Sequence, residues 1–270
     1  MLDWIYNTQP WISSSVLVAC GIAAACLVQF AIDRCVSTEI RHAHNEFTRF
    51  TVTNMSVLYA VLLAFITIAA WEALSKATDI TVAEASHVEA LYLDAEGLDD
   101  KNVAEAMRAA LRRYLHAVVE QEWLVQQAGG ISDAAAPSLR QVRKTLASFK
   151  PATPGDTMVM QEMFRYLNEL NNIRRARLEA AAGHIPESVW SVIIVLGIVT
   201  IGFTTLAGMR SGRAHFLPLA GFTATIVMVV ALIVQLDYPF RGEISVSAQP
   251  FQKILAEFES GLGSGVPAAR

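Results

Sequence analysis

Long apolar stretches without charge are the dominant pattern of this sequence. Residues 4–32, 50–71, 188–209 and 214–236 contain no Asp, Glu, Lys or Arg. Each stretch is at least as long as the ~20 apolar residues that span a bilayer core of ~30 Å. Surface helices of soluble proteins carry a polar face and rarely run this far without a charge. The pattern therefore predicts four transmembrane helices.

Between the second and third stretches, residues 72–187 show the periodicity of amphipathic helices. Apolar side chains recur about every three or four residues in two segments, at Val103, Met107, Leu111, Tyr114 and Val118, and at Val159, Met163, Tyr166, Leu170 and Ile173. One helix is expected over about 54–96, continuous with the second membrane span. Gly97 should end it, and Asp99 or Asp100 should cap the helix that follows.

The predicted fold class is an all-α membrane protein with four transmembrane helices and a helical extramembrane domain between the second and third. The expected parts are transmembrane helices 1 and 2 in 1–71, the helical domain in 72–187, transmembrane helices 3 and 4 in 188–236, a C-terminal membrane-proximal segment in 237–260, and a disordered tail or expression remnant in 261–270.

Composition agrees with a membrane protein and argues against several kinds of chemistry. The chain is 53% hydrophobic and 17% charged, whereas soluble domains carry about 25% charged residues. A net charge of -4 gives no indication of a nucleic-acid partner. The sequence has no nucleophile-elbow motif and no phosphate-binding glycine loop. We therefore expect no enzymatic activity and no cofactor.

A metal site has only weak candidates. Glu84 and His87 have the i, i+3 spacing used in carboxylate-bridged di-iron helical bundles. Those sites need two such motifs and two further carboxylates from neighbouring helices, and only one motif is present. Hydrogen bonds between helices are the simpler role for both residues, so no metal is expected.

Arginines in the short loops indicate the orientation. Arg34, Arg41 and Arg49 follow the first stretch, and Arg210 and Arg213 lie between the third and fourth. Basic residues concentrate in short cytoplasmic loops, whereas long inserted domains count for little. The pattern predicts a multi-pass plasma-membrane protein with the large domain on the extracytoplasmic side.

One face of the second stretch has polar ends and an apolar middle. Its positions follow alternating four- and three-residue spacing, at Asn54, Leu58, Val61, Phe65, Ile68 and Glu72. Such a stripe can be a packing seam between helices. It can also line a pore whose hydrophobic waist gates by dewetting.

Three acids are expected at the domain side of the membrane, namely Glu72, Glu187 and Asp237, with Arg241 close behind the last. Carboxylates at a bilayer edge are usually paired, because an unpaired charge in a low dielectric is costly. Arg241 could therefore form an ion pair with one of them and fasten the C-terminal segment. Alternatively, an unpaired acid repeated around an oligomer could form a cation-attracting ring at a pore mouth.

Six short motifs form a recognisable set. They are His44-Asn45, Leu58-Tyr59-Ala60-Val61-Leu62-Leu63-Ala64-Phe65, Trp71-Glu72, Val82-Ala83-Glu84-Ala85, Leu167-Asn168-Glu169-Leu170-Asn171 and Asp237-Tyr238-Pro239-Phe240-Arg241-Gly242. Together they resemble the bestrophin-like domain family of bacterial membrane proteins, over about 39–258. True bestrophins are pentameric ion channels with a similar layout. They have an aromatic-rich neck, for which this stripe offers only Phe65, and a cytoplasmic helical domain, opposite to the orientation that the loop arginines indicate.

The resemblance and the stripe together predict an oligomeric ion channel of the bacterial inner membrane, with the second transmembrane helix lining the pore. Its expected partners are the lipid bilayer, copies of itself (a pentamer, as the resemblance implies) and small ions. The alternative is a non-conducting membrane scaffold or sensor whose helical domain binds a partner or ligand. In that case the stripe should be buried within a protomer, against the first and fourth spans.

Overall fold

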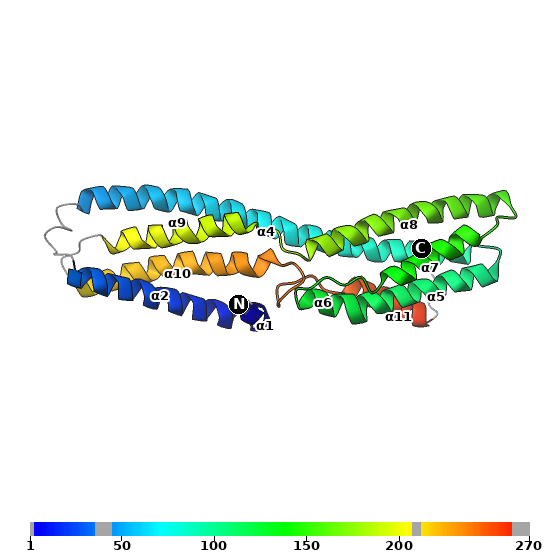
Figure 1. Cartoon of the computed structure of the whole chain (residues 1–270), viewed down its shortest axis with the longest axis horizontal. Coiled ribbons are helices and arrows are strands. Elements are labelled where there is room, and N and C mark those ends of the chain that lie inside the picture. Colours follow the sequence, from blue (N-terminus) through cyan, green and yellow to red (C-terminus); the bar gives the residue numbers. More distant parts are fainter. Residues whose placement is uncertain (1–2, 36–44, 207–211, 261–270) are drawn as a thin grey trace, which may run out of the picture. The chain divides into compact units, whose positions relative to one another are not determined.

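The computed structural model describes residues 3–35, 45–206 and 212–260, and within them it contains helices and no β-strand (Figure 1). The helices are α1 (Asp3–Asn7), α2 (Pro10–Cys35), α4 (Asn45–Glu96), α5 (Lys101–Ala117), the π-helical turn η1 (Val118–Glu122), α6 (Trp123–Gln127), α7 (Ala136–Ser148), α8 (Pro154–Ala180), α9 (Glu187–Thr205), α10 (Gly212–Asp237) and α11 (Gln249–Ser260). The expected tail, 261–270, lies outside the described residues.

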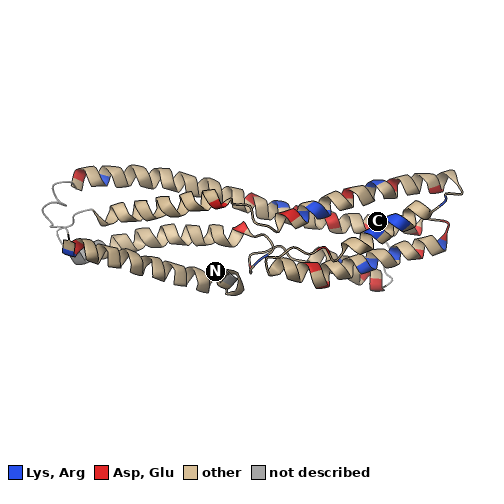
Figure 2. Ribbon diagram, in the orientation of Figure 1, with Lys and Arg blue, Asp and Glu red and all other residues tan. Residues whose placement is uncertain are grey.

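Four of these helices are long and apolar enough to cross a membrane. They are α2, α4, α9 and the Phe216–Asp237 part of α10. Apart from the helix ends, charged residues are almost absent from α2, α9, α10 and the first half of α4 (Figure 2). This confirms the prediction of an all-α membrane protein with four transmembrane helices.

The chain forms two compact units. The membrane unit consists of Met1–Ala73, His184–Asp237 and Gly242–Ile244, and the second unit consists of Leu74–Gly183, Tyr238–Arg241 and Ser245–Arg270. Helix α4 contributes its first part to the membrane unit and its last part to the second unit.

Helix α4 has 52 residues and would be about 78 Å long at 1.5 Å per residue. It ends at Glu96, immediately before Gly97, as the sequence predicts. It starts at Asn45 rather than near residue 54, because 45–53 contains no Pro or Gly and Glu46 favourably meets the positive end of the helix dipole. Arg49 therefore lies inside a helix and not in a loop.

In the membrane unit, Tyr59 joins α4 to α9. Its buried hydroxyl donates a hydrogen bond to the carbonyl oxygen of Ile193 at 3.0 Å. The ring can approach α9 this closely because the facing residue is Gly197. A Cβ atom added there would lie 2.7 Å from the Tyr59 hydroxyl oxygen, closer than real Cβ contacts allow. The small residue and the tyrosine therefore form one contact.

The helices of the second unit pack around an apolar core. Fully or nearly fully buried side chains come from α4, α5, α7, α8 and α11, among them Leu91, Leu111, Leu146, Leu167 and Phe251. Asp100 caps α5, as expected, by accepting hydrogen bonds from the backbone N–H groups of Asn102 at 3.0 Å and Val103 at 3.3 Å.

The contact between Tyr59 and Gly197 predicts non-additive mutations. Gly197→Ala should lower the free energy of unfolding by about 1–3 kcal/mol, because the new methyl group overlaps the tyrosine hydroxyl. Tyr59→Phe removes that oxygen together with its hydrogen bond, at about 1 kcal/mol. The double variant should be less destabilised than the sum of the two changes. Denaturation in detergent measures the free energy of unfolding of the wild type, the two single variants and the double variant.

Gly202→Ala on the same helix is the matched control, because nothing lies within 4 Å of a Cβ atom at Gly202. This variant should retain wild-type stability or gain slightly, since alanine favours helices over glycine by up to ~1 kcal/mol. Strict additivity of the Tyr59 and Gly197 changes would contradict the contact.

Candidate functional site

The predicted stripe of α4 is exposed along its whole length in the single chain. Leu58 is 72% exposed, Val61 50%, Phe65 68% and Ile68 55%, and the polar ends Asn54 and Glu72 are also exposed. On an ideal helix these six positions fall within an arc of about 80°. They form a continuous surface that the rest of the chain leaves uncovered.

Neighbouring positions on the other side of α4 are buried. Tyr59 is 3% exposed and Leu63 5%, and both pack with Ile193 of α9 and Ile226 and Ile233 of α10. The packing seam of α4 is therefore formed by residues outside the stripe. A scaffold of the kind described above should bury the stripe within the protomer, and the exposed fractions do not agree with that expectation.

Asp237, the last residue of α10, is a buried carboxylate with three donors. Its oxygens accept hydrogen bonds from the backbone N–H groups of His184 at 3.0 Å and Ile185 at 2.9 Å, and from the indole N–H of Trp190 at 3.1 Å. These hydrogen bonds connect the C-terminal end of α10 to the N-terminal end of α9 and the residues just before it. Asp237 thus links α10 to α9. Sequence reasoning did not anticipate these partners.

The other predicted edge residues lie in different settings. Glu72 and Glu187 are exposed. Arg241 is 9% exposed and belongs to the second unit, where its guanidinium lies against Gly129 and 5.5 Å from the centre of the Tyr238 ring. An ion pair between Arg241 and one of the three acids stays a prediction.

Gly129 is well suited to this neighbour. It has a positive φ of 84°, which favours glycine, and a Cβ atom there would lie 2.8 Å from a guanidinium nitrogen of Arg241. Gly129, which follows α6, therefore leaves the space that the Arg241 side chain occupies.

Glu84, a weak metal candidate, belongs to a buried ionic network of the second unit. Its carboxylate accepts hydrogen bonds from Arg177 at 2.7 and 3.2 Å and from the Tyr114 hydroxyl. Arg177 also donates to Glu122 at 2.7 Å and to the side-chain oxygen of Gln126 at 2.9 Å. Glu84, Tyr114, Glu122, Gln126 and Arg177 are all 0% exposed.

The network keeps its charges by pairing them. Burial opposes the charge of Arg177, but the adjacent Glu84, Tyr114 and Glu122 outweigh burial and raise the pKa of its guanidinium. Burial and the Glu84 carboxylate together raise the pKa of the Tyr114 hydroxyl well above its ordinary value, which keeps it a hydrogen-bond donor. The rings of Trp123 and Phe251 complete the site, with centres 5.9 and 5.8 Å from the Arg177 guanidinium carbon.

His87, the second metal candidate, is separated from Glu84 by its partners. Its Nδ1 lies 2.7 Å from the carbonyl oxygen of Ala83, and its Nε2 lies 3.0 Å from the carboxylate of Glu169. Both ring nitrogens and both Glu84 oxygens therefore have protein partners. Among the described residues, no three His, Cys, Asp or Glu side chains lie together in a way that could hold a metal ion.

Glu84 and His87 form hydrogen bonds to other helices, as expected. Sequence reasoning missed the buried arginines and Glu122, although one signal for the arginines was present. Arg174 and Arg177 continue the buried face of Leu167 and Leu170 at three- and four-residue spacing, where apolar residues are expected. The position of Glu122 carries no such signal. It ends the π-helical turn η1, whose extra residue per turn changes which side chains face the core.

Taken together, the four spans, the exposed α4 stripe and the charged core of the second unit define a polytopic helical membrane protein. A family model named the bestrophin-like domain matches residues 19–251, which is most of the chain. The chain therefore belongs to the bestrophin-like domain family. A search of curated proteins found no match.

Solved structures show the same fold. Three of them are variants of a bacterial bestrophin homologue from Klebsiella pneumoniae, with TM-scores of 0.67, 0.67 and 0.66 and sequence identities of 11%, 13% and 12%. The alignments cover 91%, 92% and 92% of this chain and 99%, 99% and 97% of the respective relatives. At these identities the likeness concerns the fold.

The three donors to Asp237 predict a structural role for its charge. Asp237→Asn places an amide group where one carboxylate oxygen accepted a hydrogen bond, so at least one buried donor loses its partner. The free energy of unfolding should fall by about 2 kcal/mol. Thermal unfolding of the purified protein in detergent measures this change. The matched control Glu187→Gln neutralises an exposed carboxylate and should leave the midpoint nearly unchanged, and equal midpoints for both variants would refute the role.

Proposed function

We propose that this protein is an oligomeric ion channel in which the α4 stripe lines the pore. The observation that carries the proposal is the exposure of all six stripe positions on the protomer. Membership of the bestrophin-like domain family and the shared fold of the Klebsiella pneumoniae bestrophin homologue support a membrane channel. A ring of copies would bring one stripe from each protomer to a common axis.

In this arrangement the stripe supplies the two parts that ion conduction requires. Leu58, Val61, Phe65 and Ile68 form a narrow apolar section, which can close to ions by losing water. Asn54 and Glu72 are the polar ends. A ring of Glu72 carboxylates, one from each protomer, would concentrate cations at one mouth and disfavour anions. We therefore expect a preference for cations.

The proposal places the channel in the bacterial inner membrane as a homo-oligomer, a pentamer by analogy with true bestrophins. The short-loop arginines favour residues 72–187 on the extracytoplasmic side. Bestrophins have the corresponding domain in the cytoplasm. Two of the short-loop arginines lie at helix ends that flank residues 36–44. Arg34 is in the last turn of α2, and Arg49 is in the first turns of α4.

Shortening Phe65 should increase ion flux. Phe65→Ala removes the largest apolar side chain of the stripe, which widens the section and lowers the barrier to hydrating it. Single-channel conductance or the rate of flux into liposomes should rise several-fold. Planar-bilayer recording of the purified oligomer, or ion flux into liposomes, measures it.

Phe30→Ala is the matched control, since Phe30 is a 54% exposed phenylalanine on α2, outside the stripe. It should leave flux at the wild-type level. A folded, reconstituted wild-type oligomer that passes no small ion would overturn the proposed function. Equal effects of Phe65→Ala and Phe30→Ala would instead remove α4 from the pore.

Neutralising Glu72 should weaken cation preference without unfolding the protein. Glu72→Gln keeps the size of this exposed side chain and removes the ring of charge. The reversal potential in a salt gradient should move toward zero. The free energy of unfolding should change by no more than ~0.5 kcal/mol, as for other surface substitutions. Glu257→Gln on α11, which removes a carboxylate charge outside the stripe, is the control for the loss of charge alone. If Glu72→Gln alters neither selectivity nor conductance, there is no acidic ring.

A further inference from the structure

A polar pocket of about 360 Å³ lies between α7 and α8 of the second unit. Its volume falls within the ~300–1,000 Å³ of small-molecule sites. Four arginines line it, Arg140 and Arg143 from α7 and Arg174 and Arg175 from α8. Figure 2 shows blue Lys and Arg positions on both α7 and α8. Asp133 is the acidic residue of the lining.

Among the residues that the structure describes, three of these arginines have no acidic partner. Within the described part of the chain, Arg143 donates to the amide oxygen of Asn168 at 2.7 Å, and Arg175 donates to Asn172 and to the Asn171 carbonyl. These partners are neutral, and a guanidinium remains charged at any physiological pH. The charges of Arg140, Arg143 and Arg175 are therefore left uncompensated around one cavity.

The fourth arginine, Arg174, is the buried and fixed residue of the pocket lining. It is 6% exposed and is held from behind by the buried Glu122 carboxylate at 2.5 Å. Its Nε is buried and has no hydrogen-bond partner among the described residues. The Asp133 carboxylate, whose side chain is 69% exposed, lies 2.8 Å from the same guanidinium. A fixed, partly unsatisfied cation thus faces the pocket next to an exposed internal anion.

We infer that this pocket binds a phosphate-bearing anion, with Arg140, Arg143 and Arg175 contributing charge and Arg174 a fixed anchor. Planar guanidinium groups match the oxygens of phosphate with paired hydrogen bonds, and several of them around one cavity favour multiple negative charges. Asp133 takes the place of the ligand on Arg174 when the pocket is empty. The phosphate could belong to a soluble compound or to a lipid headgroup, which the experiment distinguishes.

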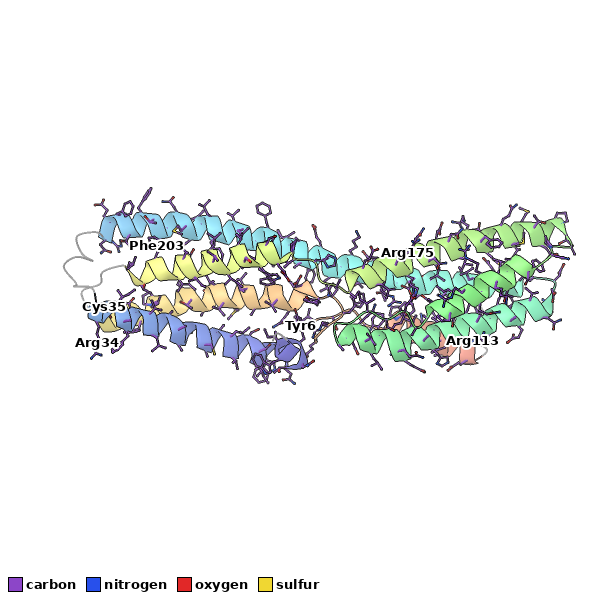
Figure 3. All side chains as sticks on the ribbon, viewed as in Figure 1. Tyr6, Arg34, Cys35, Arg113, Arg175 and Phe203 are labelled. Atoms are coloured by element: carbon purple, nitrogen blue, oxygen red, sulfur yellow. The ribbon has the colours of Figure 1, made fainter. Side chains whose placement is uncertain are left out.

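The test uses the full-length protein in phosphatidylcholine nanodiscs at physiological salt, which screens non-specific attraction between exposed charges. Inorganic tripolyphosphate is titrated in, and binding is measured by calorimetry. Arg140→Gln and Arg175→Gln should each weaken binding about tenfold. Arg113→Gln on α5 is the matched control, because Arg113 is exposed and does not line the pocket. It should bind as tightly as the wild type (Figure 3).

Asp133→Asn gives a change of opposite sign. It removes the internal competitor for Arg174, so tripolyphosphate should bind several-fold more tightly. A mere loss of folding cannot strengthen binding, which separates this result from damage to the unit. Glu105→Gln removes a comparably exposed carboxylate outside the pocket and should leave binding unchanged.

A second titration identifies the source of the phosphate. Soluble short-chain phosphatidylglycerol is added to the same nanodiscs and compared with tripolyphosphate. Tighter binding of the lipid, lost in Arg175→Gln, assigns the site to a headgroup, and the reverse order assigns it to a soluble phosphate compound. If neither probe binds at millimolar concentration, or if the arginine variants bind as well as Arg113→Gln, the inference is wrong. None of these measurements depends on ion conduction, so this inference and the proposed channel function are tested separately.

Discussion

The second unit depends on a buried cation that it must neutralise. Arg177 is 0% exposed, and removing a guanidinium from water is costly unless opposite charges and hydrogen bonds surround it. Glu84 from α4, Glu122 from η1 and Gln126 from α6 supply them. These contacts fix the register between α4, the η1–α6 segment and α8. A shift of any of them would leave a charge unpaired in the core, so the network selects one arrangement rather than merely adding stability.

The same network is linked to the polar surface. Glu122 binds Arg177 with one oxygen and Arg174 with the other, and it accepts the backbone N–H of Ala135 at 2.8 Å. Arg174 in turn lines the pocket between α7 and α8. The loop that leads into α7, the buried core and this pocket therefore share one set of charges. Arg174 therefore connects the lining of the pocket to Glu122.

The membrane unit is organised by size and shape, because its spans contain almost no charge. Tyr59 on α4 fits against Gly197 on α9, and a Cβ atom at Gly21 of α2 would lie 2.8 Å from a methyl group of Val227 on α10. Small residues permit such close approach between apolar helices. This packing uses one side of α4 and leaves the opposite side, with Phe65, exposed.

The sequence by itself determined the four spans, the end of α4 just before Gly97 and a cap at Asp99 or Asp100, because runs of apolar residues, glycine and capping side chains act locally. It also marked the α4 stripe by its spacing, but exposure of that stripe depends on which helices pack against α4. The partners of Glu84, Asp237 and Arg174 come from residues 30 to 93 positions away along the chain. Only the tertiary structure decides such partners, because a charge at a given position fixes its need for a counter-charge and not which distant helix supplies it.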